Sequence, residues 1–207
     1  DTVLIDSNLT TELSLNNKDV KKLYNYVNNK NIDYASYKNR GKKLSWDYLS
    51  LVTMYNIPQN YVLKDEKNIE YVDSYSFLDK YREIFGSDLT ISKEEQNTTT
   101  CGAVNYKNDV YYPNWYCKEK SDDSIIVTYL KNVTIDKEYL NINKYYAFIV
   151  KTDENTFDLY SSDEKEEKTL IATNLSIYEI SNYINEMNIM SYRFKKINNQ
   201  YYLNNIK

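Results

Sequence analysis

The segment "DSIIVTYLKNVTI", residues 123–135, consists mainly of β-branched and aromatic side chains and predicts a β-strand. "YYAFIVKTD", residues 145–153, has the same character. The polar segments that follow are typical of hairpin connections, so the second half of the chain is expected to form an antiparallel sheet. Shorter runs predict further strands at residues 88–91, 156–163 and 168–174.

The first part of the chain predicts helices instead. In residues 16–27, apolar side chains recur at the spacing of one helix face, and Asn16 or Asn17 is a suitable N-cap. Ser45 would cap a second helix, which Pro58 ends. A third helix is expected over residues 73–86. Residues 28–43 lie between the first two helices and are polar, which predicts a loop that could hold a short helical turn.

The order of these elements indicates the fold class. Helices come first and strands second, with one late helix at residues 175–187, where Ser176 and Glu179 match a capping box. Two strand-like runs around Asn198 and Asn199 predict a closing hairpin. This order is typical of an α+β fold with a mainly antiparallel sheet. We expect a single α+β domain over residues 1–207, with a helical lobe over about 1–86 and a sheet lobe over about 87–207.

Composition excludes several classes of chemistry. The 207 residues include no histidine, which excludes Ser-His-Asp and Cys-His catalysis and histidine-ligated metals. The three glycines are isolated, so no phosphate-binding glycine loop can form and nucleotide cofactors are not expected. No cofactor is predicted. The 24 tyrosines are a marked excess, for which an A/T-rich genome is the simplest explanation.

Charge and hydropathy limit the partners. The net charge of −4 and the absence of a lysine cluster argue against nucleic-acid binding. No apolar run approaches the roughly 18 residues of a membrane span. The chain opens with "DTVLIDSNLT" and has no initiator methionine, from which we expect that a leader has been removed or that the chain was cut.

The two cysteines, Cys101 and Cys117, bound the aromatic segment "CGAVNYKNDVYYPNWYC". Two cysteines form an incomplete zinc site, and a catalytic thiolate would lack its usual imidazole partner. Two unpaired buried thiols and a disulfide remain as alternatives. We favour a disulfide because the cysteine count is even and the surroundings are polar.

The aromatic side chains between the cysteines are the predicted binding residues. Their rings could stack on sugars or anchor a protein partner, although the simpler alternative is that they pack over the sheet and cover the loop. These residues are Tyr111, Tyr112, Trp115 and Tyr116.

Several segments together resemble a known family. "VKKLYNYV" at 20–27, "YREIFGSDLTI" at 81–91, the cysteine-bounded loop and "YRFKKINNQYYLNNI" at 192–206 are similar to uncharacterised exported proteins and lipoproteins of clostridia and related A/T-rich Gram-positive bacteria. The resemblance implies an extracellular or envelope-anchored location. It implies no enzyme class and no functional residues.

Two functional hypotheses follow from these observations. The first is a non-enzymatic exported or cell-surface domain that contacts protein or glycan through the aromatic loop. The alternative is a cell-envelope carbohydrate-active or other hydrolase that uses carboxylates. Glu94–Glu95 and Asp122–Asp123 are adjacent pairs, and a glycosidase needs two carboxyl groups facing each other across a cleft.

Overall fold

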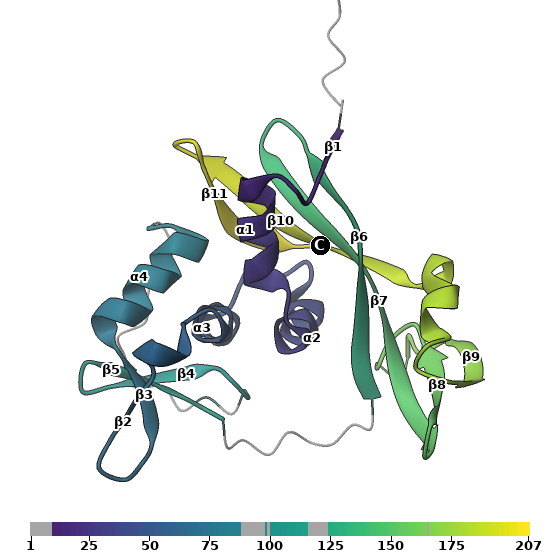
Figure 1. Cartoon of the computed structure of the whole chain (residues 1–207), viewed down its shortest axis with the longest axis horizontal. Helices are drawn as coiled ribbons and strands as arrows, with labels where there is room; N and C mark the ends of the chain where they lie inside the picture. The colour runs from purple at the N-terminus through teal and green to yellow at the C-terminus, as the bar shows by residue number, and fades with distance from the viewer. Residues whose placement is uncertain (1–9, 88–97, 99, 116–123, 165) are drawn as a thin grey trace, which may run out of the picture.

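A computed structural model of the chain describes residues 10–87, 98, 100–115, 124–164 and 166–207. Helices and two antiparallel sheets make up the described part, which is therefore a mixed α+β structure (Figure 1). Segments from both halves of the sequence share the main hydrophobic core, which runs from Val20 to Ile206.

The large sheet is built around one long strand, β7 (Tyr139–Asp153). One side of β7 pairs with β6. The other side pairs with β10 as far as Tyr146 and with β8 from Phe148 onward. All pairs are antiparallel, as the sequence predicted. The remaining strands are β1 (Thr11–Leu13), β6 (Ser124–Ile135), β8 (Thr156–Tyr160), β9 (Leu170–Leu175), β10 (Asn188–Ile197) and β11 (Gln200–Ile206).

Three of the α-helices match the predictions. α1 (Lys18–Val27), α3 (Trp46–Tyr55) and α4 (Ser74–Phe85) begin after their caps Asn17, Ser45 and Asp73, whose side chains accept backbone hydrogen bonds. α3 packs against both α2 and α4 and lies between them (Figure 1).

The helix α2 (Lys30–Asn39) corrects the sequence interpretation, because it is a full helix where a polar loop was expected. The Asn29 side chain caps it by accepting a hydrogen bond from the Asn31 amide. Its buried face is half polar, with Asp33 and Ser36 beside Ile32 and Tyr37. That composition hides the apolar stripe by which helices are recognised.

The second, smaller sheet lies beyond α3 and α4. Its order is β2 (Leu63–Lys64), β3 (Glu70–Asp73), β5 (Val110–Pro113) and β4 (Val104–Lys107). Side chains of α3 satisfy the backbone of the edge strand β4: the Val104 amide donates to Ser50 Oγ at 3.0 Å, and Trp46 Nε1 donates to the Val104 carbonyl at 3.2 Å. A helices-first order is not what the structure has, since β1 precedes α1 and two further strands, β2 and β3, lie between α3 and α4.

The end of the chain is partly as predicted. The closing hairpin is present, and Asn198 and Asn199 adopt φ values of 47° and 63°, which a two-residue type I′ turn requires. The late helix is a 3₁₀ segment, η2 (Ile180–Glu186), rather than an α-helix. One hydrogen bond of the predicted capping box is present, from the Ser176 amide to Glu179 Oε2 at 2.8 Å, but η2 begins later, after Glu179, and has no side-chain cap.

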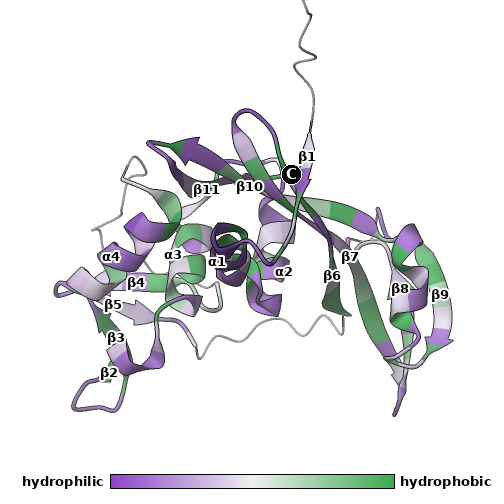
Figure 2. Cartoon of the chain, turned by 45° about the horizontal axis from the view of Figure 1, so that its top comes forward, coloured by the Kyte–Doolittle hydropathy of each residue, from purple (hydrophilic) through white to green (hydrophobic). Residues whose placement is uncertain are grey.

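Apolar residues are concentrated in α3 and along β6 and β7 (Figure 2). The main core joins the α-helices to one face of the large sheet through residues such as Phe77, Ile142, Phe148 and Phe194. A smaller cluster fills the space between β7, β8, β9 and η2.

A buried ion pair ties α2 to the sheet. Lys144 Nζ on β7 lies 2.8 Å from Asp33 Oδ1, and each side chain is almost fully buried. Asp33 also accepts hydrogen bonds from Tyr192 at 2.6 Å and Thr128 at 2.7 Å, and Lys144 donates to the Val27 carbonyl at 2.6 Å. Burial lowers the pKa of Lys144, while the Asp33 carboxylate opposes that shift. The network explains why α2 can bury an acidic residue.

Candidate functional site

A groove of about 840 Å³ lies between α2, α3 and the start of β6, and we call it the α2–α3 groove. Its volume lies in the range of ordinary ligand pockets, about 300–1,000 Å³. Aromatic and apolar groups alternate with polar ones along it. The lining residues are Lys30, Asn31, Tyr34, Ala35, Lys38, Asn39, Ser45, Asp47, Tyr48, Leu51, Tyr55, Thr100, Cys101, Trp115, Ser124, Ile125 and Ile126.

One wall of the groove is a single face of α2. Asn31, Tyr34, Ala35 and Lys38 follow the spacing i, i+3, i+4 and i+7, which places them on the same side of the helix. The opposite side of α2 is held against the sheet by the Asp33 network. The fold therefore fixes which face of α2 points into the groove.

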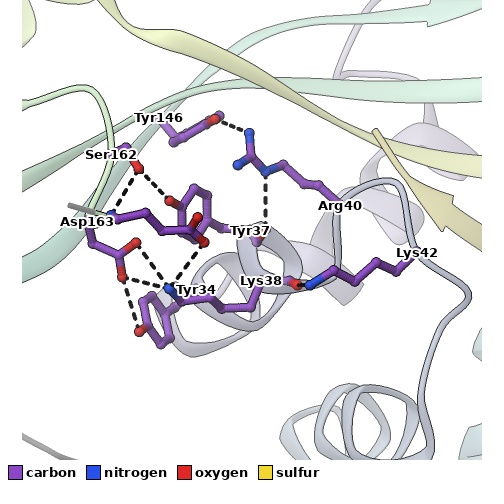
Figure 3. A network of polar contacts seen from close by, with 9 residues as sticks. Tyr34, Tyr37, Lys38, Arg40, Lys42, Tyr146, Ser162 and Asp163 are labelled. Carbon is purple, nitrogen blue, oxygen red and sulfur yellow. Dashed lines mark hydrogen bonds and ion pairs between the residues drawn. The ribbon is translucent and has the colours of Figure 1, made fainter. Parts of the chain in front are cut away.

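A buried carboxylate holds this wall in place (Figure 3). Asp163 follows β8, and its side chain is 3% exposed. It accepts a hydrogen bond from the Tyr34 hydroxyl at 3.3 Å and pairs with Lys38 Nζ at 3.0 Å. Both groove-lining side chains are thus restrained by a residue more than 100 positions later in the chain.

The same segment is anchored beside Asp163 through Tyr37 (Figure 3). The Tyr37 hydroxyl and Ser162 Oγ share a hydrogen bond of 2.8 Å. Burial raises the pKa of Tyr37 to about 12, so the phenol is neutral at physiological pH. Arg40 donates to the Tyr37 carbonyl at 3.1 Å and to the Tyr146 hydroxyl. Its guanidinium lies over both tyrosine rings, as in cation–π pairs.

The other wall is formed by an aromatic pair. Tyr55 at the end of α3 and Trp115 after β5 meet edge to face, with ring centroids 5.3 Å apart. Both rings are partly exposed. They pack directly on Gly102, where an added Cβ would lie 2.9 Å from the Tyr55 ring and 3.4 Å from the Trp115 ring. Gly102 also has φ +79°, so the position favours glycine for two reasons.

A second hollow of about 280 Å³ adjoins the groove, and we call it the α3–β3 hollow. It shares Tyr55 and Trp115 with the groove, so the aromatic pair borders both spaces. Its other lining residues are Met54, Ile57, Gln59, Val62 and Glu70.

The structure places the predicted binding residues that it describes in different environments. Trp115 lines both hollows. Tyr111 is fully buried and stacks on Phe77 with ring centroids 4.0 Å apart, so it is a core residue and we remove it from the candidate surface. Tyr112 packs near Tyr71 on β3 and is not among the lining residues of either hollow. Tyr116 lies outside the described residues.

The disulfide stays a prediction. Cys101 is partly buried and lines the α2–α3 groove, but Cys117 lies outside the described residues. The carboxylate pairs Glu94–Glu95 and Asp122–Asp123, considered for hydrolysis, also lie outside them.

Sequence reasoning missed Tyr34, Lys38 and Tyr55 as site residues. The first two were hidden because α2 was taken for a loop. Their shared helical spacing was the available signal. Tyr55 lies at the end of the second predicted helix, and its contacts with Trp115 and Gly102 become visible only in the structure.

Neither a group of metal-ligating side chains nor a membrane-spanning helix is found in the part of the chain that the structure describes. Within those residues, histidine, cysteine, aspartate and glutamate side chains do not gather in groups of three or more that could hold a metal ion. The described helices are all too short or too polar to cross a membrane.

Comparisons with known proteins leave the site to be interpreted from its own chemistry. No protein-family model matches the chain, and searches of curated proteins and of solved structures find no match either.

Proposed function

We propose that this protein is a non-enzymatic, exported binding domain that holds a glycan in the α2–α3 groove. The observation that carries the proposal is the composition of that groove. Sugar rings present apolar faces and polar edges, and a matching site needs aromatic rings beside hydrogen-bonding side chains. The groove supplies Tyr55 and Trp115 as rings, and Asn31, Asn39 and Thr100 as polar groups.

The restraint of the groove walls supports a binding role. Asp163 holds Tyr34 and Lys38, and Gly102 seats the Tyr55–Trp115 pair. Side chains that are already ordered lose less conformational entropy when a ligand binds. A groove fixed on both sides therefore has a lower cost of binding than a mobile loop.

Binding is favoured over the hydrolase alternative by the carboxylates of the groove. Glycoside hydrolysis commonly uses two carboxyl groups that flank the scissile bond. Among the described residues that line the groove, Asp47 is the one carboxylate, and it accepts a hydrogen bond from Thr100 Oγ1 at 2.7 Å.

An exported location agrees with the predicted Cys101–Cys117 disulfide, since disulfides persist in oxidising compartments. The proposal therefore places the domain outside the cell or on the cell envelope, where glycans are accessible.

Calorimetric titration with soluble oligosaccharides tests the proposal. We expect saturable binding of at least one neutral oligosaccharide, and a loss of about five- to thirtyfold in affinity in Tyr55→Ala, because the aromatic contact contributes about 1–2 kcal/mol. Tyr75→Ala is the matched control, since Tyr75 is 82% exposed on α4 and lines neither hollow. Equal loss in both variants, or no binding by the wild type, would contradict the proposal.

A further inference from the structure

We infer that the α3–β3 hollow receives the acetamido group of an N-acetylated sugar, so that the ligand of the groove is a glycan containing N-acetylhexosamine. This inference rests on the proposed function. It adds a second subsite and a chemical class of ligand.

The composition of the hollow matches an acetamido group. Met54, Ile57 and Val62 provide apolar surface for a methyl group. Glu70 provides a carboxylate that can accept a hydrogen bond from the amide N–H, and the Gln59 side chain can donate to the amide carbonyl. An acetamido group needs these three kinds of contact together.

The position of the hollow also suits an acetamido group. Tyr55 and Trp115 border both the groove and the hollow. A sugar ring that stacks on this pair from the groove side could therefore direct a ring substituent into the hollow. The substituent would stay close to the ring, as an acetamido group does.

Other common sugar substituents fit less well. A carboxylate would meet the like charge of Glu70, which is unfavourable at short range. A free ammonium group would pair with Glu70, but it would also lose part of its hydration shell on contact with Met54, Ile57 and Val62. A hydroxyl group would leave the apolar part of the hollow without a contact.

Titration of the wild-type protein with three oligosaccharides of equal length tests the inference without any variant. The ligands are a chitin oligosaccharide, its de-acetylated counterpart and a cellulose oligosaccharide that has no nitrogen. We expect the chitin oligosaccharide to bind about tenfold more tightly than either of the others, since a filled site with paired hydrogen bonds discriminates to this extent.

The variant Glu70→Ala then assigns the preference to the hollow. It should lower the affinity for the chitin oligosaccharide more than the affinity for the cellulose oligosaccharide, so that the ratio between the two falls towards one. Glu66→Ala is the matched control, because Glu66 is an exposed carboxylate in the turn before β3. The ratio should be unaffected in that variant, and thermal unfolding should confirm that both variants are folded.

The outcomes separate the inference from the proposed function. Equal affinity for all three oligosaccharides, or tighter binding of the de-acetylated one, would overturn the inference and leave a glycan-binding groove. A chitin preference that Glu70→Ala leaves intact would also overturn it. If none of the oligosaccharides binds, the proposed function fails and the inference fails with it.

Discussion

Tyrosine hydroxyls occupy two opposite environments in this protein. The Tyr192 hydroxyl is fully buried and donates to Asp33 at 2.6 Å. The hydroxyls of Tyr81 and Tyr111 are buried without a hydrogen-bond partner among the described residues. Burial raises the pKa of both Tyr81 and Tyr111 to about 12, so both phenols stay neutral. A buried hydroxyl without a partner costs free energy, whereas one bonded to a charged carboxylate stabilises the fold.

This contrast predicts opposite effects for the same substitution. Tyr192→Phe should lower the free energy of unfolding by about 1.5–3 kcal/mol, because Asp33 loses a charge-assisted hydrogen bond. Tyr81→Phe should be neutral or slightly stabilising. Urea unfolding at pH 7 measures both. A loss in Tyr81→Phe as large as in Tyr192→Phe would mean that the Tyr81 hydroxyl has a partner, such as a buried water molecule.

Two glycines allow the free-energy cost of backbone strain to be separated from the cost of a steric contact. Gly41 and Gly102 both have positive φ, at +67° and +79°, but an added Cβ meets nothing within 4 Å at Gly41 and the Tyr55 ring at 2.9 Å at Gly102. Gly41→Ala should therefore cost about 1 kcal/mol for backbone strain alone. Gly102→Ala should cost more and should also weaken ligand binding. Equal costs in urea unfolding would show that the Tyr55–Trp115 pair does not need this glycine.

Among the elements, α1 and α4 are joined by a carboxylate that links stability to pH. Glu83 on α4 is paired with Lys80 at 2.6 Å and Lys22 at 3.3 Å, and it accepts a hydrogen bond from Tyr26. Partial burial raises the pKa of Glu83, but these donors outweigh it and lower the pKa from 4.5 to about 2. The folded state therefore binds the Glu83 proton more weakly than the unfolded state does.

The sign of this shift predicts how stability changes in acid. The contribution of Glu83 to the free energy of unfolding is complete above pH about 4.5 and is lost as the pH falls towards 2. Glu83→Gln should lower the free energy of unfolding by about 1 kcal/mol at pH 7, a value reduced by solvent screening. The difference from wild type should shrink between pH 4.5 and pH 2. Asp79→Asn controls for net charge, and a Glu83→Gln deficit that stays constant with pH would contradict the assignment.

The helices and strands differ in how well the sequence predicted them. α1, α3 and α4 and the closing hairpin were predictable because their apolar spacing, caps and Asn-Asn turn are local signals. α2 was not predictable in this way, because its buried Asp33 is explained only by Lys144, Thr128 and Tyr192 on distant strands. Such long-range pairs leave no trace in the local pattern.

The candidate site was predicted only in part, for the same reason. Trp115 was one of the four aromatic residues that the sequence predicted as binding residues. Its neighbours in the groove come from α2 and α3, and the carboxylate that restrains Tyr34 and Lys38 comes from the segment after β8. The register of β5 decides that Tyr111 faces the core and stacks on Phe77. None of these contacts is local in the sequence.

The molecule as a whole places the α2–α3 groove between two helices, the first strand residues of β6 and the segments beside the small sheet. The α2 wall is tied to the large sheet by the Asp33–Lys144 pair, and the Tyr55–Trp115 wall is seated beside the small sheet by Gly102. Both walls thus belong to packed structure. This arrangement predicts that ligand binding changes the surroundings of Trp115 and leaves the core around Trp46 unchanged.

The two tryptophans allow this claim to be tested directly, because Trp46 reports on the core and Trp115 on the groove. Protein labelled with 5-fluorotryptophan should give two ¹⁹F NMR signals, which Trp46→Phe assigns. Titration with a chitin oligosaccharide should shift the Trp115 signal saturably and leave the Trp46 signal in place. A Trp115 signal that stays fixed at saturating ligand would contradict a glycan-binding groove.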